Sequence, residues 1–192
     1  NLDNGGSIVN RRCGMLGQLI EVITPRPDGP DRFIGHNMHP EAFRVYGGQV
    51  LAQAVSAAAA TVDAGRAIHS QHAYFLRPGD TSQPIVLEVE RARDGASFSS
   101  RRVTALQRGK PILVSSMSFQ LPAVGDDYQP DMPAVPAPET LPSERELGLA
   151  ADTIDESFMI TTGEDLDIRV IEPIDWRNPV PREPVLQAWM KT

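Results

Sequence analysis

The hydrophobic positions between residues 49 and 62 recur at helical spacing. They are separated mostly by alanine, so a helix here is apolar on nearly every side. A helix of this kind is normally buried against a sheet, because no face of it favours water. The sequence therefore predicts a buried helix over about 49–62, entered through Gly47-Gly48.

Four strand-like runs follow this helix, with turn residues between them. Ile85, Leu87 and Val89 alternate with more polar neighbours, and Asp94-Gly95 is a tight-turn signal. We expect strands at about 67–76, 84–93, 98–108 and 112–121. A helix followed by a four-stranded antiparallel meander predicts an α+β layer in which the sheet wraps over one helix.

The chain divides into four regions by composition. Residues 1–30 form an N-terminal arm with one short apolar element, and residues 31–122 form the main domain. Residues 123–142 are rich in proline and predict a linker. In 143–192, Ser143 and Glu146 have the spacing of a capping box, so a helix starts there and runs to about 158. Two later strands, near 168–171 and 185–190, begin a second sheet that we expect to be incomplete.

Charge and cysteine content exclude several classes of protein. The net charge is −7, and residues 123–192 carry 5 Lys+Arg against 15 Asp+Glu, which disfavours nonspecific binding to nucleic acid. No apolar run reaches the ~18 residues of a membrane-spanning helix. One cysteine, Cys13, allows no disulfide within the chain, so we expect a cytoplasmic protein. Asn1 is followed by no leader pattern, and the front of the chain is expected to be trimmed or disordered upstream.

The histidines offer little catalytic or metal-binding chemistry. His36 and His39 lie in a loop, and neither they nor the strand pair, His69 and His72, have the third ligand that a zinc site needs, so no metal cofactor is expected. Residues three apart on a strand point to opposite faces, so His69 and His72 should not share a site. The serine-rich runs lack a nucleophile-elbow pattern.

The glycine pair at the helix entry has two interpretations. Gly47 and Gly48 expose the first backbone amides at the positive end of the helix, where they can bind a carbonyl oxygen or an oxyanion. Alternatively, the glycines only allow the helix to enter close to the sheet, and spacing alone favours this second interpretation.

Four blocks of this sequence resemble acyl-CoA thioesterase II. In chain order, they are Phe43–Ala54, His69–Asp80, Arg93–Val103 and Ser118–Gln120. They cover much of residues 31–122. The later Ile168-Arg169-Val170 and Ala188-Trp189-Met190 are also similar to this family.

The resemblance implies a double hot-dog, in which two long helices are each wrapped by an antiparallel sheet. It also implies hydrolysis of fatty acyl-CoA to free acid and CoA by an activated water, without metal or covalent intermediate. In the family, an Asp, a Ser or Thr and a Gln of the second hot-dog orient this water. They come some residues after the block that corresponds to Trp189-Met190-Lys191 and are therefore expected beyond Thr192, so none of the three is assigned in this chain.

The site residues expected within the first hot-dog follow from this resemblance and from the chain's chemistry. His69 is the catalytic candidate, and Gly47, Gly48, Gln49 and Arg102 are candidates for binding acyl-CoA. Arginines and a lysine near the Asp94-Gly95 hairpin are further candidates for the CoA phosphates, namely Arg91, Arg93, Arg101, Arg102, Arg108 and Lys110.

Two other functions compete with this one. One is a noncatalytic hot-dog module that binds acyl-CoA or assembles with partner chains. The other, a hot-dog dehydratase, is disfavoured because Gly-Gly-Gln at 47–49 replaces the histidine expected at the helix entry. A homo-oligomer is expected whether the chain is a thioesterase or a noncatalytic module.

Overall fold

The computed structural model describes residues 15–40, 42–151, 167–175, 178 and 180–191. The chain divides into two compact units, a larger one at Leu19–Asp131 and a smaller one that contains the chain from Met132 onward. The division after Asp131 falls within the predicted linker, 123–142.

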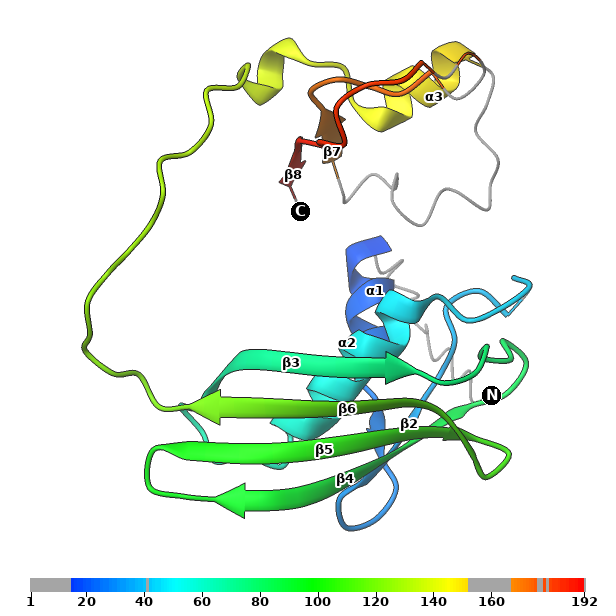
Figure 1. The fold of residues 1–192 in the computed structure, drawn as a ribbon. Helices are drawn as coiled ribbons and strands as arrows, with labels where there is room; N and C mark the ends of the chain where they lie inside the picture. The colour runs from blue at the N-terminus through cyan, green and yellow to red at the C-terminus, as the bar shows by residue number, and fades with distance from the viewer. Residues whose placement is uncertain (1–14, 41, 152–166, 176–177, 179, 192) are drawn as a thin grey trace, which may run out of the picture. The chain divides into compact units, whose positions relative to one another are not determined.

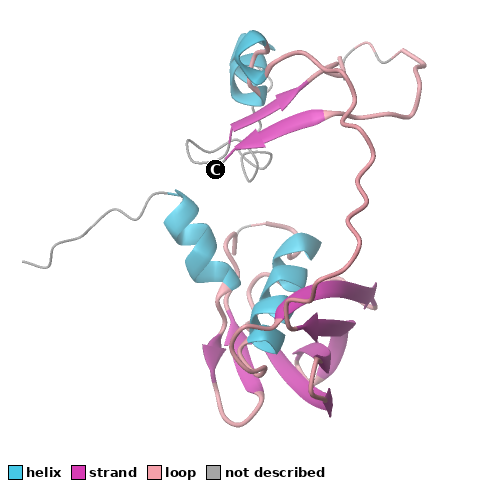
Figure 2. Ribbon diagram, turned by 90° about the vertical axis from the view of Figure 1, so that its left-hand side faces the viewer, coloured by secondary structure: helices cyan, strands magenta, loops and turns pink. Residues whose placement is uncertain are grey.

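The larger unit is a six-stranded antiparallel sheet that curves around helix α2 (Gly47–Ala59), as Figures 1 and 2 show. A second helix, α1 (Met15–Ile23), precedes the sheet. In spatial order the strands are β1 (Arg26–Pro27), β2 (Arg32–Gly35), β4 (Ile85–Asp94), β5 (Phe98–Gln107), β6 (Lys110–Gln120) and β3 (Ala67–Phe75). The predicted α+β architecture is confirmed.

The core lies between α2 and the inner face of the sheet. On the helix, Ala54, Ala57 and Ala58 are completely buried, since their small side chains let the backbone approach the strands. On the sheet, alternate residues such as Leu87 and Val103 are buried at the same level. The alternation predicted for β4 is confirmed, and the helix begins at Gly47, two residues earlier than expected.

The order of the strands corrects one prediction. Only β4, β5 and β6 form a meander, whereas β3 crosses to the far side of the sheet and pairs with β6. The connection between β3 and β4 is too long for a tight hairpin. Gln107 fixes it, because its side chain accepts a bond from Asp80 N and donates to Asp80 O and Gln83 O. Because β3 pairs only with β6 in the described sheet, it is an edge strand, and nearly all of its side chains are exposed.

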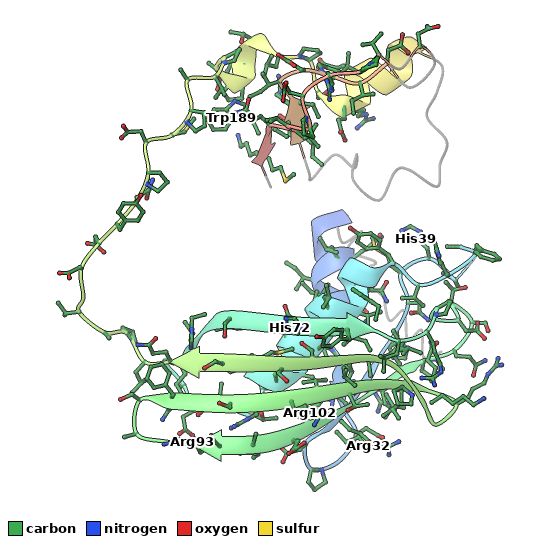
Figure 3. All side chains as sticks on the ribbon, in the orientation of Figure 1. Arg32, His39, His72, Arg93, Arg102 and Trp189 are labelled. Carbon is green, nitrogen blue, oxygen red and sulfur yellow. The ribbon has the colours of Figure 1, made fainter. Side chains whose placement is uncertain are left out.

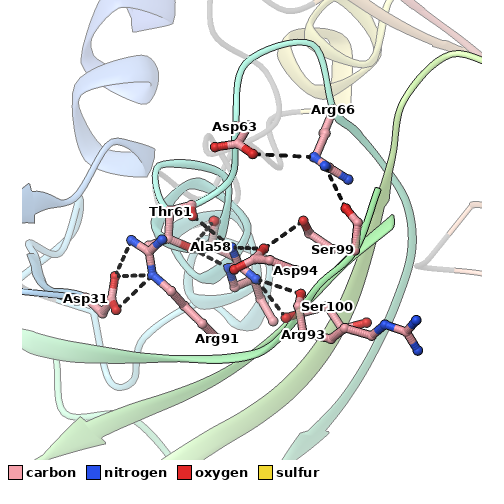
Figure 4. Close-up of polar contacts among 12 residues, drawn as sticks. Asp31, Ala58, Thr61, Asp63, Arg66, Arg91, Arg93, Asp94, Ser99 and Ser100 are labelled. Atoms are coloured by element: carbon pink, nitrogen blue, oxygen red, sulfur yellow. Dashed lines mark hydrogen bonds and ion pairs between the residues drawn. The ribbon is translucent and has the colours of Figure 1, made fainter. Parts of the chain in front are cut away.

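A buried arginine, Arg101, connects the segment after α2 to the β4–β5 hairpin. Figure 4 labels its partners Thr61 and Asp94. Arg101 is 2% exposed, and it donates to the hydroxyl and the carbonyl of Thr61, both at 2.8 Å. It also donates to Asp94 at 2.7 Å, and Asp94 in turn accepts a bond from Ser99. These bonds hold the pKa of Asp94 below its usual value, the bond from Arg101 most of all.

The smaller unit contains η1 (Pro138–Thr140), α3 (Glu144–Ala151), β7 (Asp167–Val170) and β8 (Ala188–Lys191). Its first helix begins at the predicted capping box, since Ser143 N donates to Glu146 at 2.7 Å and Glu146 N donates to the Ser143 hydroxyl at 3.2 Å. Continuation of this helix to about 158 lies outside the described residues. The two later strands are present, although β8 starts three residues after the expected position.

The proline-rich segment is not entirely a linker. Arg169 donates to the carbonyls of Pro138 and Leu141, and the Trp189 indole donates to Pro136 O at 3.0 Å. Residues 136–141 are therefore attached to the β7–β8 pair. Among the described residues, no helix has both the length and the apolar character needed to span a membrane.

Candidate functional site

The amino end of α2 presents unbonded backbone amides. Tyr46 precedes the helix and no side chain caps it. The amides of Gln49 and Val50 both donate to Tyr46 O. Within the described part of the chain, the amides of Gly47 and Gly48 have no hydrogen-bond acceptor. Two free donors therefore lie where the helix dipole is positive, a suitable place for a carbonyl oxygen or an oxyanion.

Aromatic rings lie close to both glycines. A Cβ on Gly47 would lie 3.0 Å from the Phe75 ring at the end of β3. A Cβ on Gly48 would lie 2.4 Å from the Tyr46 ring, closer than real contacts allow. Both interpretations of the glycine pair thus have structural support: the residues allow aromatic rings to approach, and their amides stay unbonded.

Gln49 binds the loop that follows β2. Its Oε1 accepts from Met38 N at 3.1 Å, and its Nε2 donates to His36 O and to Asn37 Oδ1, each at 3.1 Å. Asn37 then donates to Thr81 O at 2.8 Å, which joins this loop to the β3–β4 connection. Gln49 therefore positions the start of α2 with its side-chain amide, and Asn37 is a positioning residue that sequence reasoning missed.

A second glutamine, one turn further along α2, attaches the first helix. Gln53 is completely buried, and its Nε2 donates to Val22 O and His36 O, both at 2.8 Å. A Cβ on Gly35 would lie 2.5 Å from Gln53 Oε1, so only glycine fits opposite this side chain. The helical spacing of residues 49 and 53 places both amides on the face that meets the loop after β2.

His69 lies far from the amino end of α2. The pairing of β3 with β6 shifts between Ile68 and Ser70, and His69 lies at this bulge on the outer face of the sheet. There it forms a 2.8 Å hydrogen bond with Ser118 and an edge contact with the Phe98 ring. Phe75, the strand residue that touches Gly47, is six positions away, roughly 20 Å along the strand. The arrangement required for His69 to act as a base at the helix end is therefore absent.

The same bulge corrects the prediction for the histidine pair. His72 pairs with Ser116, an exposed residue of the outer face, and its ring contacts that of Tyr74. Both strand histidines therefore share the outer face, although strict alternation would have separated them. The expectation of opposite faces was wrong because it assumed a regular strand.

Arg102 also lies on the outer face, where it pairs across the strands with Glu90 on one side and Ser116 on the other. Figure 3 shows it on the exposed side of the sheet with Arg32, Arg93 and His72. The structure thus does not bring Arg102 to the glycine pair, because the sheet separates them.

The other basic candidates divide by their partners. Arg91 holds Asp31 through both carboxylate oxygens at 2.9–3.0 Å, and this bond keeps the pKa of Asp31 below its usual value. Arg108 pairs with Asp80 at 2.8 Å. Arg93 and Lys110 have no ion pair within the described residues. In that same part of the chain, no three His, Cys, Asp or Glu side chains are grouped as metal ligands.

The water-orienting residues expected from the family resemblance stay a prediction. Strand β8 ends at Lys191, the last residue that the structure describes, and Thr192 lies outside the described residues. The Asp, the Ser or Thr and the Gln are expected beyond Thr192, and Thr192 itself is assigned no catalytic role. The site geometry therefore concerns the amino end of α2 and the sheet around it.

Comparison with known proteins finds matches for the part of the chain that forms the sheet and α2. Residues 35–120 match the family model for the acyl-CoA thioesterase N-terminal domain. Human acyl-coenzyme A thioesterase 8 is 43% identical over 124 residues, which are 64% of this chain and 39% of the relative. Acyl-CoA thioesterase 2 of Haemophilus influenzae is 45% identical over 130 residues, 68% of this chain and 46% of the relative.

Solved structures agree with these matches. The acyl-CoA thioesterase II TesB2 of Mycobacterium marinum has a TM-score of 0.67 and 34% identity, over 90% of this chain and 59% of its own. A hot-dog protein from Alicyclobacillus acidocaldarius, 18% identical, has a TM-score of 0.66 over 80% of this chain and 55% of its own, and supports the fold alone. The hot-dog fold predicted from the resemblance is confirmed. The matching part of this chain covers less than half of each curated relative.

Proposed function

Because residues 35–120 match the family model for the acyl-CoA thioesterase N-terminal domain, we propose that the chain takes part in hydrolysing fatty acyl-CoA to free fatty acid and CoA. The amino end of α2 binds the thioester in this proposal. The observation that carries it is the pair of unbonded amides at Gly47 and Gly48. Two donors fixed in place polarise a thioester carbonyl and stabilise the oxyanion that forms when water attacks it.

The neighbourhood of these amides suits a thioester with an apolar acyl chain. Phe75 and Tyr46 have their rings beside Gly47 and Gly48, and both rings are more than half exposed. Gln49 and Asn37 hold the preceding loop, so the amides are fixed before substrate binds. Fixed donors avoid the free-energy cost of reorganising the site during the reaction.

Activation of the attacking water is assigned to a second hot-dog half, by residues expected beyond Thr192. Gln49 uses its amide on the loop, and His69 faces the other side of the sheet. Loss of general-base catalysis typically lowers a rate by ~10²–10⁴. We therefore expect the 192-residue chain alone to hydrolyse acyl-CoA barely above background, whereas a protein extended through a second hot-dog is active.

Release of free CoA thiol tests this function. It is measured for the 192-residue chain and for the extended protein, each with Gly48→Ala and His69→Ala variants. Gly48→Ala should lower turnover of the extended protein, because the added methyl displaces the Tyr46 ring from beside the free amides. His69→Ala should have little effect. Rapid turnover by the 192-residue chain that His69→Ala abolishes would contradict the assignment.

Assembly and location complete the proposal. Strand β3 lies at the edge of the sheet, and in the described structure no strand pairs with its outer side. Its unpaired backbone N–H and C=O groups can form hydrogen bonds with a strand of another sheet. A second copy of the chain is the partner that we propose, which gives a homo-oligomer. A cytoplasmic enzyme of fatty acid metabolism, without nucleic-acid partners, agrees with the single cysteine and the charge of −7.

Light scattering coupled to size-exclusion chromatography checks the assembly. Ser70→Lys places a charge on the edge strand and should shift the chain toward monomer, whereas Ser100→Lys on the interior strand β5 should not. Equal masses for all three proteins would contradict pairing through β3.

A further inference from the structure

Basic side chains gather around the loop that follows β3, at the same end of the sheet as the start of α2. Arg77 begins this loop and donates to Pro111 O at 2.7 Å. Arg108, in the turn between β5 and β6, donates to Asp80 of the loop at 2.8 Å. Lys110 precedes Pro111 in the same turn. Three cations therefore come from two adjacent connections.

The segment before α2 brings a fourth cation to this loop. Val45 N donates to Gly79 O at 3.0 Å, and the Val45 side chain packs where a Cβ on Gly79 would lie. Arg44 comes directly before Val45 and is exposed. The loop-end cluster is accordingly defined as Arg44, Arg77, Arg108 and Lys110.

Charge favours this cluster over the outer face as a site for an anion. In the described structure, Asp80 is the one carboxylate that forms an ion pair with its members. On the outer face, by contrast, Arg102 lies opposite Glu90, and Arg32 lies opposite Glu88. An anion on the outer face would therefore lie near carboxylates as well as guanidinium groups.

Exposed rings lie beside the cluster. Phe43 is 99% exposed and Tyr46 is 62% exposed, and both belong to the segment that Val45 attaches to the loop. A cationic group supplies donors for phosphate oxygens, while a free aromatic face stacks on a nucleobase. The combination fits a ligand that carries both phosphates and a purine.

We propose that the loop-end cluster binds the phosphates of the CoA nucleotide and that the exposed Phe43 ring stacks on its adenine. The inference rests on the proposed function, since it places the nucleotide at the end of the sheet where the thioester would lie. A substrate whose carbonyl is at Gly47 reaches this cluster without crossing the sheet. To reach Arg102 it would have to pass around the sheet to the other face.

Two charge reversals that leave the fold intact test the proposal. Arg44→Glu with Lys110→Glu changes two exposed members that make no side-chain hydrogen bond within the described residues. Arg93→Glu with Arg102→Glu is the control, because it makes the same change in net charge on or beside the outer face. Affinity for free CoA, and for pantetheine as a ligand without phosphates, is measured by calorimetry with the 192-residue chain.

The loop-end variant should bind CoA about tenfold or more weakly at low salt, with a smaller salt dependence, and the control should change by less than about twofold. Pantetheine should bind all three proteins alike. Equal or greater weakening in the control, or no CoA binding by the unmodified chain, would overturn the proposal.

The outcome is separable from the proposed function. If the extended protein hydrolyses acyl-CoA while the loop-end variant binds CoA normally, the nucleotide site is wrong and the function stands. If CoA binding depends on the cluster but no thioester is hydrolysed, the nucleotide site stands and the function is wrong.

Discussion

Replacing Arg101 by methionine should destabilise the larger unit far more than the same change at Arg102. The two residues are neighbours in β5 and point to opposite faces of the sheet. Arg101 is 2% exposed and bonds Thr61 twice and Asp94 once at 2.7–2.8 Å. Arg102 is exposed and makes no ion pair or side-chain hydrogen bond within the described residues.

The size of the effect follows from these contacts. Removing one partner of a buried ion pair costs about 3–5 kcal/mol. The Asp94 side chain is 48% exposed, so water can solvate it afterwards, and we expect about 3 kcal/mol. In a unit of this size about 3 kcal/mol lowers the melting temperature by roughly 12 °C. Arg102→Met should change the free energy of unfolding by less than about 0.5 kcal/mol.

Urea unfolding and thermal unfolding, each followed by circular dichroism, measure both variants against the unmodified chain. A large decrease in the free energy of unfolding for Arg101→Met, with almost no change for Arg102→Met, supports the register of β5. Similar losses, or a larger loss for Arg102→Met, would refute the burial and pairing on which the site description depends.

Three further results are expected. Because Arg101 lowers the folded-state pKa of Asp94, the stability that this carboxylate contributes is complete above its unfolded pKa and is lost as pH falls through the folded pKa. The free energy of unfolding should therefore decline below about pH 4, and less steeply in Asp94→Asn. Urea unfolding at a series of acid pH values measures both proteins. Limited proteolysis should first cut within residues 122–131, which have no helix or strand, and an intact 122–131 segment after cleavage elsewhere would contradict the two-unit division. Asn37→Ala removes the side-chain donor to Thr81 O and one of the two donors to Gln83 O, which keeps its bond from Gln107. It should cost about 1–3 kcal/mol and speed hydrogen exchange in residues 79–83, and unchanged exchange there would count against the role given to Asn37.

Local patterns predicted most of the elements of the larger unit. The helix near 49–62 and the strands near 67–121 depend on periodicity and turn residues, both of which are visible in the sequence. The crossing of β3 to β6 was not predictable in this way, because strand order depends on contacts between distant residues. Gln107 fixes this crossing through Asp80, 27 positions earlier, and nothing in its local sequence marks it.

Candidate site residues were predictable from the sequence where their role depends on backbone amides. They were not predictable where the role depends on which face of the sheet a side chain points to. Gly47 and Gly48 are recognisable because glycine at a helix start leaves amides accessible. His72 was expected on the face opposite His69, but one extra residue in a strand reverses every later side chain, and a bulge has no clear signal here. Nothing in the sequence distinguishes Arg101 from Arg102, yet Arg101 is buried and Arg102 is exposed.

The most direct test of the thioester site is the response of the glycine amides to a substrate analogue. The protein is labelled with ¹⁵N at glycine and titrated with a non-hydrolysable acyl-CoA analogue that keeps the carbonyl oxygen, and the amide shifts are followed by NMR. The amides of Gly47 and Gly48 should move to the lower field typical of a new hydrogen bond, while Gly65, in the turn between the other end of α2 and β3, should show no such shift. Saturable binding that leaves both amides of α2 unchanged would contradict the account.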